Sequence, residues 1–404
     1  MSLPYIQSLT RDELALALMP FCRQVAKNRR RNANAEKKEA YAVQKSHFHA
    51  KQLFVWLYQK HVTDWDLMDD LSKGLREWLK DNFAIFHLNV LTQQQSQDGT
   101  RKVLWRLEDG KTVESVIIPA TGQDAKFTED GNEYKGDSND AELNHENWSR
   151  MTICISSQVG CAMACKFCLT GVQGFDRNLS VAEIVSQVSQ MAQLYPLSNI
   201  VFMGMGEPLH NPDAVIKACQ IFRDDAGLAF SRRRVTVSTS GLVPQIDRLN
   251  EETDVTLAIS LSGTTDLQRE VIMPVNRKWP LEALLDSCRR FQGDGKVWIT
   301  FEYVMLKDVN DTLEDAERLV TLLEGVRAKV NLIPFNPYPG AIYERSDPRQ
   351  VERFKDHLIA NNVFTSVRIS RGQDILAACG QLRSAFGTAR GTEKHVEEGY
   401  ASSS

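Results

Sequence analysis

The stretch CAMACKFC brings three cysteines close together, at Cys161, Cys165 and Cys168. Cysteine thiolates bind zinc and iron–sulfur clusters, and this density favours a metal site over three thiols buried by chance. A structural zinc ion needs a fourth ligand, which Cys154, a short distance upstream, could supply. A [4Fe–4S] cluster bound by three cysteines would instead leave one iron open to a further ligand.

Further residues able to bind a ligand follow later strand-like runs. In MGMGEP, Gly206 allows the backbone to approach a ligand closely, and the carboxylate of Glu207 could accept hydrogen bonds from an ammonium group. Ser238 in STSG and Ser260 in SLSG each end a strand-like run. A single hydroxyl at such a place is more commonly a cap, but its recurrence favours a ligand-binding edge.

These segments lie in residues 151–383, where strand-like and helix-like runs alternate. About six such units predict an α/β fold with a parallel sheet, either a partial barrel or a doubly wound sheet. In both architectures ligands bind where the strands reach their carboxyl ends. We therefore expect the cysteine loop, MGMGEP and the two serine segments to surround one site.

The rest of the chain predicts additions to this domain. Residues 1–95 place apolar side chains at helical spacing and predict a helical domain. Residues 96–120 alternate and predict a β-hairpin that carries Glu114 and turns at Asp109 and Gly110. Residues 121–150 contain eight acidic residues and predict a long surface loop, and residues 384–404 predict a disordered tail.

The composition is that of a globular protein, with 404 residues of which 42% are hydrophobic and 25% charged. The sequence has no run of about 18 apolar residues, so it predicts no membrane span. Its N-terminal segment is unlike a signal peptide. Eight cysteines in a chain of this length favour a reducing compartment, so we expect the cytoplasm. Residues 21–60 hold ten Lys and Arg against two Glu, a local net charge of +8, which suits either a solvated face or a phosphate-binding surface.

Five segments together resemble the RlmN/Cfr family of radical S-adenosylmethionine RNA adenosine methyltransferases: CISSQVGCAMACKFC, MGMGEP, RRRVTVSTSG, NLIPFNPYPG and AACGQL. The resemblance runs from about residue 47 to residue 383 and implies a partial (β/α)6 radical-SAM barrel. It implies that Cys161, Cys165 and Cys168 bind a [4Fe–4S] cluster whose open iron chelates the amino and carboxylate groups of S-adenosylmethionine. The resemblance implies further contacts with S-adenosylmethionine from Gly206, Glu207, Ser238, Ser260, Leu261, Ser262 and Asn336.

The same resemblance implies methylation of an adenine ring carbon, C2 for RlmN and C8 for Cfr. These carbons are not nucleophilic, so the transfer requires a radical and a carrier for the methyl group. Cys379 matches the carrier, which takes a methyl group from one S-adenosylmethionine and is activated by a second. Cys154 matches the resolving thiol, which would form a transient disulfide with Cys379, and Glu114 matches the proton acceptor.

The expected substrate is RNA, with C2 of an adenosine in 23S ribosomal RNA as the target and transfer RNA as a second candidate. We also expect an electron-donating reductase such as flavodoxin, a monomeric protein and no membrane partner. Ser262 stands where the family commonly has histidine, and the acidic segment 121–150 and the basic N-terminal segment also depart from the family pattern. These departures leave open C8 methylation, or a paralogue that modifies another adenosine. More distant alternatives are a radical enzyme acting on a protein or small molecule, and a zinc-stabilised RNA-binding protein without activity.

Overall fold

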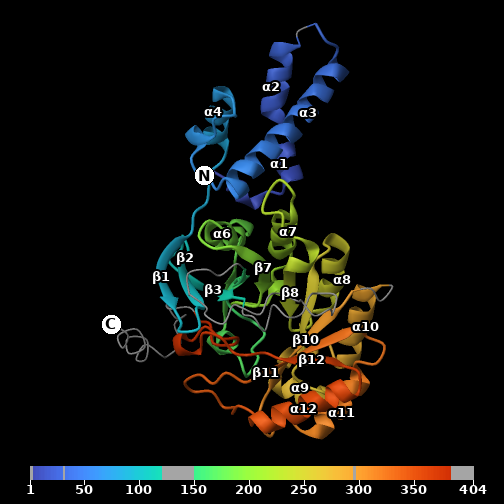
Figure 1. Cartoon of the computed structure of the whole chain (residues 1–404). Helices are drawn as coiled ribbons and strands as arrows, with labels where there is room; N and C mark the ends of the chain where they lie inside the picture. Colours follow the sequence, from blue (N-terminus) through green and yellow to red (C-terminus); the bar gives the residue numbers. More distant parts are fainter. Residues whose placement is uncertain (1–2, 31, 121–149, 294–296, 384–404) are drawn as a thin grey trace, which may run out of the picture. The chain divides into compact units, whose positions relative to one another are not determined.

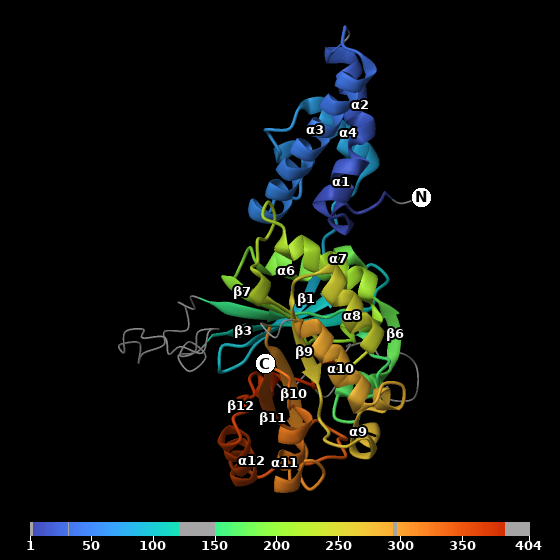
Figure 2. The same ribbon diagram turned by 90° about the vertical axis from the view of Figure 1, so that its right-hand side faces the viewer.

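The computed structural model describes residues 3–30, 32–120, 150–293 and 297–383. The predicted acidic loop, apart from Arg150, and the predicted tail 384–404 therefore lie outside the described residues. The chain divides into two compact units, whose elements are labelled in Figures 1 and 2. The helical unit comprises Met1–Leu88, Ser180–Tyr195 and Asp213–Val235, and the sheet unit comprises Asn89–Leu179, Pro196–Pro212 and Thr236–Ser404.

The helical unit is built around a long helix that packs against two shorter ones. Its helices are α1 (Arg11–Ala17), α2 (Met19–Arg29), α3 (Ala35–Phe54), α4 (Lys73–Asn82), α6 (Val181–Met191) and, from its second residue, α7 (Pro212–Arg223). A capping box starts α1, because Thr10 Oγ1 accepts from the Glu13 N–H while the Glu13 carboxylate accepts from the Thr10 N–H. Asn34 caps α3, which contacts both α1 and α2. Leu14 and Phe54 are buried in the core of this unit.

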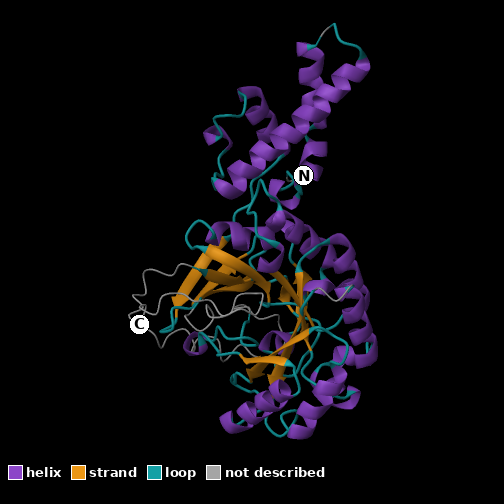
Figure 3. Ribbon diagram, turned by 45° about the vertical axis from the view of Figure 1, so that its right-hand side comes forward, coloured by secondary structure: helices purple, strands orange, loops and turns teal. Residues whose placement is uncertain are grey.

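The sheet unit is organised by one sheet, drawn in orange in Figure 3. Its strands, in the order in which they lie side by side, are β1 (Asn89–Gln95), β2 (Arg101–Arg106), β3 (Thr112–Pro119), β4 (Met151–Cys154), β7 (Leu197–Phe202), β8 (Val235–Thr239), β9 (Thr256–Ser260), β10 (Ile299–Met305), β11 (Ala328–Pro334) and β12 (Phe364–Val367). Neighbours from β1 to β4 pair antiparallel, whereas β4 and β7, and successive strands from β8 to β12, pair parallel. The predicted α/β fold, with an open sheet and a helical N-terminal region, is confirmed.

The antiparallel part of the sheet contains the expected hairpin and one strand that the sequence analysis missed. β2 and β3 are joined by a turn in which Gly110 has a φ of +82° and the Lys111 N–H donates to Asp109 Oδ1 over 3.1 Å. Residues 89–95, which the sequence analysis included in the helical segment, form β1 instead. β1 pairs with β2 along its length, so its conformation is set by backbone hydrogen bonds to the hairpin rather than by helical propensity.

Helices follow the parallel strands and leave the carboxyl ends of these strands free to form a site. The helices of the sheet unit are α5 (Leu169–Gln173), α8 (Val243–Glu252), α9 (Asp266–Ile272), α10 (Leu281–Gln292), α11 (Leu313–Leu322) and α12 (Pro348–Ala360). α8 packs on α10, α11 packs on α12, and α12 packs on β12. The strands are apolar where they are covered, and Val237, Phe301 and Leu332 are fully buried. Among the described residues, no helix has both the length and the apolar character needed to cross a bilayer.

Candidate active site

One cavity in the sheet unit collects most of the residues expected to form the site. The predicted residues that line it are Cys161, Cys165, Cys168, Gly206, Glu207, Ser238, Ser260, Asn336 and Cys379. They come from the loops that follow β5 (Gln158–Gly160), β7 and β11, from the ends of β8 and β9, and from the segment after β12. The site therefore lies at the carboxyl ends of the parallel strands, as the fold class predicts.

The three-cysteine loop is held in place by backbone contacts that need glycine at its start. Gly160 has a φ of +73°, and a Cβ atom there would lie 1.9 Å from the carbonyl oxygen of Gly174, which accepts from the Cys161 N–H over 2.8 Å. The Cys168 N–H donates to the Cys165 carbonyl over 3.2 Å. The Lys166 N–H donates to Ile272 at the end of α9, over 2.9 Å. The loop is thus fixed both by its own turn and by a neighbouring helix.

The three thiols of the loop lie in a buried environment in which they can become metal ligands. Burial, together with a neighbouring thiol, raises the pKa of Cys161 to about 12. Burial and neighbouring thiols also raise the pKa of Cys165 and Cys168. Backbone N–H groups oppose the increase for Cys161 and Cys168. Thiols in this state become ligands when a bound metal takes the place of the proton. Across the residues that the structure describes, no three His, Cys, Asp or Glu side chains converge on a single ion. In a [4Fe–4S] cluster each cysteine binds a different iron, so the three thiols need not converge in this way.

Glu207 connects the MGMGEP turn to the end of β8. Its Oε1 accepts from the Leu209 N–H over 3.1 Å and its Oε2 accepts from the Ser240 N–H over 2.8 Å. Burial raises the pKa of this carboxyl, although these N–H groups oppose the increase. Gly206, with a φ of +101°, lies so close to Gln158 that a Cβ atom would be 2.6 Å from the Gln158 Cβ. Glu207 therefore connects the turn to the end of β8 and lies in the wall of the cavity.

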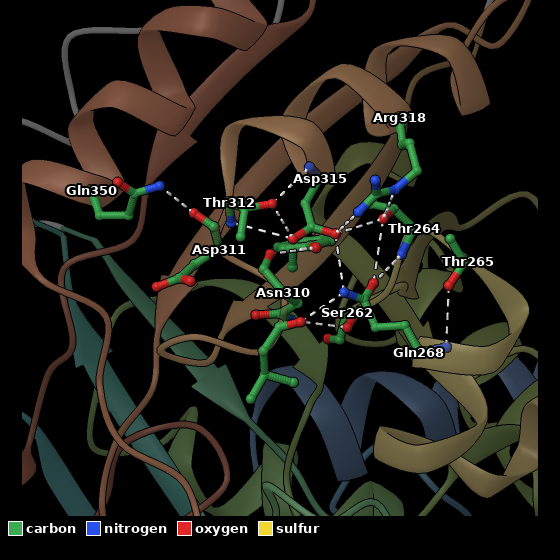
Figure 4. Close-up of polar contacts among 12 residues, drawn as sticks. Ser262, Thr264, Thr265, Gln268, Asn310, Asp311, Thr312, Asp315, Arg318 and Gln350 are labelled. Carbon is green, nitrogen blue, oxygen red and sulfur yellow. Dashed lines mark hydrogen bonds and ion pairs between the residues drawn. The ribbon is translucent and has the colours of Figure 1, made fainter.

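Two of the predicted contacts, Leu261 and Ser262, do not line the cavity. Ser262 is fully buried with a φ of +49°, and its Oγ accepts from the Val304 N–H over 3.2 Å. Its carbonyl accepts from Asn310 Nδ2 over 3.0 Å, within the network drawn in Figure 4. The left-handed backbone conformation directs Ser262 toward the residues of this network. In the same network Thr264 Oγ1 donates to Asp315 Oδ1 over 2.9 Å. We therefore assign Leu261 and Ser262 to the support of the loop after β9.

Cys379 lies in a C-terminal segment that is anchored to the three-cysteine loop. The Leu169 N–H donates to the Gly380 carbonyl over 2.8 Å, and Thr170 Oγ1 donates to the Leu382 carbonyl over 2.6 Å. Asn336 Nδ2 donates to the Cys379 carbonyl over 3.2 Å. These contacts place a free thiol on the wall that also contains the three cysteines.

Cys154 lies at the end of β4 and is 5% exposed. Burial and, after it, the neighbouring Cys379 thiol raise its pKa to about 12. The two thiols are thus close enough to interact electrostatically, although Cys154 does not line the cavity itself. Both thiols are free in this structure.

Glu114 lies on β3 and is 1% exposed, outside the cavity lining. Its Oε1 is 3.2 Å from Lys102 Nζ, and its Oε2 accepts from the Arg383 N–H over 3.0 Å. Burial raises the pKa of Glu114, while Lys102 and the Arg383 N–H lower it. The Ser156 hydroxyl donates to the Glu114 carbonyl over 2.6 Å, which connects this strand to the segment after Cys154. The structure therefore brings Glu114 to the C-terminal segment that carries Cys379.

Arg269 is a structural element of the site that the sequence did not reveal. It is fully buried on α9, and its guanidinium donates to the Ser240, Ser260 and Leu261 carbonyls over 2.5, 3.1 and 3.0 Å. Burial lowers its pKa to about 10, whereas Cys165 is among the groups that raise it. Arg269 thus ties the ends of β8 and β9 together beside the cysteine loop. In the sequence it stands in a short polar helix, DLQREVI, that resembles a solvent-exposed segment.

Comparison with known proteins agrees with this geometry. Residues 155–323 match the radical SAM superfamily, and residues 38–85 match the N-terminal domain of ribosomal RNA large subunit methyltransferases. The chain is 49% identical to the dual-specificity RNA methyltransferase RlmN of Geobacter sulfurreducens, over 84% of this chain and 87% of that protein. It is 45% identical to the protein of the same name from Geotalea uraniireducens, over 87% of this chain and 96% of that one.

A solved structure shows the same fold. The crystal structure of a radical SAM methyltransferase from Sphaerobacter thermophilus is 37% identical, with a TM-score of 0.75 over 94% of this chain and 99% of that one. The similarity to these relatives covers 84% and 87% of this chain, and the residues that match the radical SAM superfamily include the cysteine loop. The chain therefore belongs to the RlmN family: it is a radical S-adenosylmethionine RNA methyltransferase, and its cofactors are a [4Fe–4S] cluster and S-adenosylmethionine.

Proposed function

We propose that this protein methylates C2 of an adenosine in 23S ribosomal RNA, with transfer RNA as a second substrate, through a methyl group carried on Cys379. The observation that carries the proposal is the neighbourhood of two free thiols, Cys379 and Cys154, beside the three-cysteine loop. A simple polar methyl transfer would need neither thiol, because the acceptor would attack S-adenosylmethionine directly. A carrier and a resolving thiol are required when the acceptor carbon is not a nucleophile.

The cavity residues have separate tasks in this proposal. When bound, the cluster and two molecules of S-adenosylmethionine supply a methyl group and a carbon radical. Cys161, Cys165 and Cys168 hold the cluster. Cys379 carries the methyl group as a thioether and, after this group has lost a hydrogen atom, becomes linked through its carbon to the adenine ring.

Release of the product requires a base and a second thiol. Glu114 takes the proton from the substituted ring carbon, and the adduct gives up its unpaired electron, which the bound cluster would take back. The Cys154 sulfur then attacks the Cys379 sulfur. The bond between the Cys379 sulfur and the methylene carbon then breaks, and protonation of this carbon gives the methylated adenine. A Cys154–Cys379 disulfide remains on the protein. Because the pKa of Cys154 is about 12, its thiol must lose a proton as it attacks. The Glu114 carboxylate is paired with Lys102 and accepts a hydrogen bond from the Arg383 N–H. The C-terminal segment must therefore release the carboxylate before Glu114 can take a proton.

We also propose that the helical unit binds RNA phosphates. Lys27, Arg29, Arg30, Lys37 and Lys51 are exposed on α2, α3 and the segment between them. Arg31 of the predicted basic run lies outside the described residues. The match to a ribosomal RNA methyltransferase N-terminal domain covers much of α3 and supports this assignment. Cationic side chains in this density bind phosphates without sequence preference and make affinity dependent on salt.

Mass spectrometry of nucleosides tests the proposed target carbon. Reconstituted protein is incubated anaerobically with a reductant, deuterated S-adenosylmethionine and both RNA classes, and a Cys379→Ala variant serves as control. Labelled 2-methyladenosine from wild type alone supports the proposal, whereas 8-methyladenosine shows Cfr-type chemistry. Consumption of S-adenosylmethionine without label in either RNA would point to another substrate. We further propose that the protein works as a cytoplasmic monomer and receives its electron from a flavodoxin-type reductase.

A further inference from the structure

Lys102 is a buried cation beside the proposed proton acceptor, and the proposed steps give it no task of its own. Its side chain is 9% exposed, and its Nζ is 3.2 Å from Glu114 Oε1. A lysine in the interior is costly unless its charge is paired, so the Glu114 carboxylate is what makes this burial possible. Strands β2 and β3 thus bring a base and a cation together in one buried pair.

The sheet fixes both members of this pair. Lys102 lies opposite Val116, and Leu104 lies opposite Glu114, so Lys102 and Glu114 are diagonal neighbours on one face of β2 and β3. A long side chain can reach across such a diagonal. β3 is paired on its other side with β4, so the contact lies inside the sheet rather than at its edge. The Lys102–Glu114 contact therefore depends on strand pairing and does not need the C-terminal segment.

The hydrogen bond to the other oxygen of Glu114 comes from the C-terminal segment, which must move in the proposed mechanism. Glu114 Oε2 accepts from the Arg383 N–H over 3.0 Å. The start of the same segment is held separately by the turn between β1 and β2, where the Gly372 N–H donates to Asp98 Oδ2 over 2.8 Å. The Arg383 end can therefore leave the carboxylate while Gly372 stays in place. When it does, Lys102 remains on the other oxygen.

Lys102 also contacts the chain that leads to the methyl carrier. Its Nζ donates to the Leu376 carbonyl over 3.5 Å, three residues before Cys379. This distance is at the long end for a hydrogen bond, so the contact with Glu114 is the stronger of the two. One ammonium group thus lies between the base and the segment that carries Cys379.

The electrostatics of Glu114 agree with a task for this cation. Burial raises the pKa of Glu114, and the charge of Lys102 is the first of the influences that oppose the increase. Arg383 of the C-terminal segment also opposes it. Cys154 of β4 lies opposite Val116 and shares the same face, but its thiol stays neutral because its pKa is about 12. Lys102 is therefore the cation on the sheet that favours the ionised form of the carboxylate.

We infer that Lys102 is a positioning residue for the proposed proton transfer: it keeps the Glu114 carboxylate ionised and in place after the Arg383 N–H has left it. The inference rests on the proposed role of Glu114 and goes beyond it by naming the group on which that role depends. A carboxylate buried without a cation would take a proton from water and could then accept none from the ring carbon. The proton that Glu114 accepts stays on its carboxyl group, and Lys102 keeps its charge throughout.

The test measures RNA methylation and 5′-deoxyadenosine formation across the pH range for cluster-loaded wild type, Lys102→Met and Lys102→Arg. In Lys102→Met, the pH at which RNA methylation falls to half should rise by about 1–3 units, because an opposite charge at this distance lowers a carboxyl pKa by about that amount. Formation of 5′-deoxyadenosine does not need the base and should not show this shift. Lys102→Arg keeps the charge and should restore the wild-type midpoint. Lys307→Met removes a lysine that is paired with Glu344 at the surface, and should behave as wild type.

Glu114→Gln separates a failure of this inference from a failure of the proposed base. If Glu114→Gln loses RNA methylation but Lys102→Met keeps the wild-type midpoint, Glu114 stands and the role of Lys102 is overturned. If Glu114→Gln methylates RNA with the wild-type profile, the proposed base itself is wrong.

Other results would assign the lysine to the fold alone and so overturn the inference. These are an equal shift in Lys102→Met and Lys102→Arg, or an equal shift for both products. Where Lys102→Met does not load its cluster, Lys102→Gln replaces it with the same expected shift. Loss of the cluster in both variants would show that the ion pair is needed for folding rather than for the position of the base.

Discussion

The three-cysteine loop and the thiol pair Cys154–Cys379 lie in the same unit but are assembled in different ways. The loop is fixed mainly by contacts within a short stretch of chain, from Gly160 to Gly174, and by one backbone hydrogen bond from Lys166 to Ile272. The thiol pair and Glu114 come from β3, β4 and the C-terminal segment, and depend on contacts between residues more than 200 positions apart, such as Thr170 with Leu382 and Glu114 with Arg383. In the proposed mechanism, radical generation therefore depends mainly on a local structure, and methyl transfer depends on the position of a distant segment. The two functions should be separable by mutation.

The largest effect is expected from the loop. Replacement of Cys161, Cys165 or Cys168 by Ala removes a cluster ligand and should abolish cluster binding and all turnover. Iron and sulfide analysis with the visible spectrum measures the loss. Cys288→Ala, a change at a buried thiol on α10, serves as control and should keep the cluster. A normal cluster in any of the three loop variants would contradict the assignment.

A glycine replacement tests whether the loop is set by its local geometry. Gly160→Ala places a Cβ atom 1.9 Å from a backbone oxygen, so the loop must move, and cluster content should fall strongly. Gly110→Ala has a similar positive φ but nothing within 4 Å, so only the backbone strain of about 1 kcal/mol is expected there. Iron content of both variants, measured with thermal unfolding, distinguishes the clash from the strain. Equal cluster loading in both would show that the Gly160 contact is not needed.

The pH dependence should differ between the two regions. Burial raises the pKa of Glu114 above its ordinary value of 4.5, and this carboxyl must be ionised to accept a proton. RNA methylation should therefore decrease, as the pH is lowered, at a higher pH than an exposed carboxylate would give. Formation of 5′-deoxyadenosine, which does not need Glu114, should not show this decrease. Measuring both products across the pH range in wild type and Glu114→Gln checks the assignment, and identical profiles for the two products in wild type would refute it.

The smallest effect is expected from a single anchor of the C-terminal segment. Thr170→Val removes the hydroxyl that holds the Leu382 carbonyl, a hydrogen bond worth about 1 kcal/mol. The yield of methylated RNA per 5′-deoxyadenosine should fall a few-fold, whereas cluster content should fall only slightly, because the Thr170 hydroxyl also hydrogen-bonds Cys168. Thr321→Val, which removes an exposed hydroxyl on α11, should change neither quantity. Loss of the cluster in Thr170→Val would mean that the two regions are not independent.

The sequence predicted what depends on local pattern. The alternation of strands and helices, the Asp109–Gly110 turn and the spacing of the cysteines in the loop each depend on a few neighbouring residues, and the structure contains all of them. β1 was missed because its strand conformation depends on pairing with β2 rather than on its own composition.

The departures within the site have the same origin. The resemblance implies a ligand contact from Ser262, and the structure shows its Oγ and its carbonyl in hydrogen bonds with Val304 and Asn310. Arg269 was missed because a charged residue in a short polar helix gives no sign in the sequence that it will be buried. Only the packed strand ends around Arg269 show that it connects them.

The central claim is that Cys379 and Cys154 act as carrier and resolving thiol, and one measurement tests it most directly. Cys154→Ala protein is incubated anaerobically with S-adenosylmethionine, a reductant and RNA, and the products are separated under denaturing, reducing conditions. The account predicts a covalent protein–RNA adduct that is lost when Cys379 is also replaced by Ala. Free methylated RNA from the Cys154→Ala variant at the wild-type rate, without an adduct, would contradict the account.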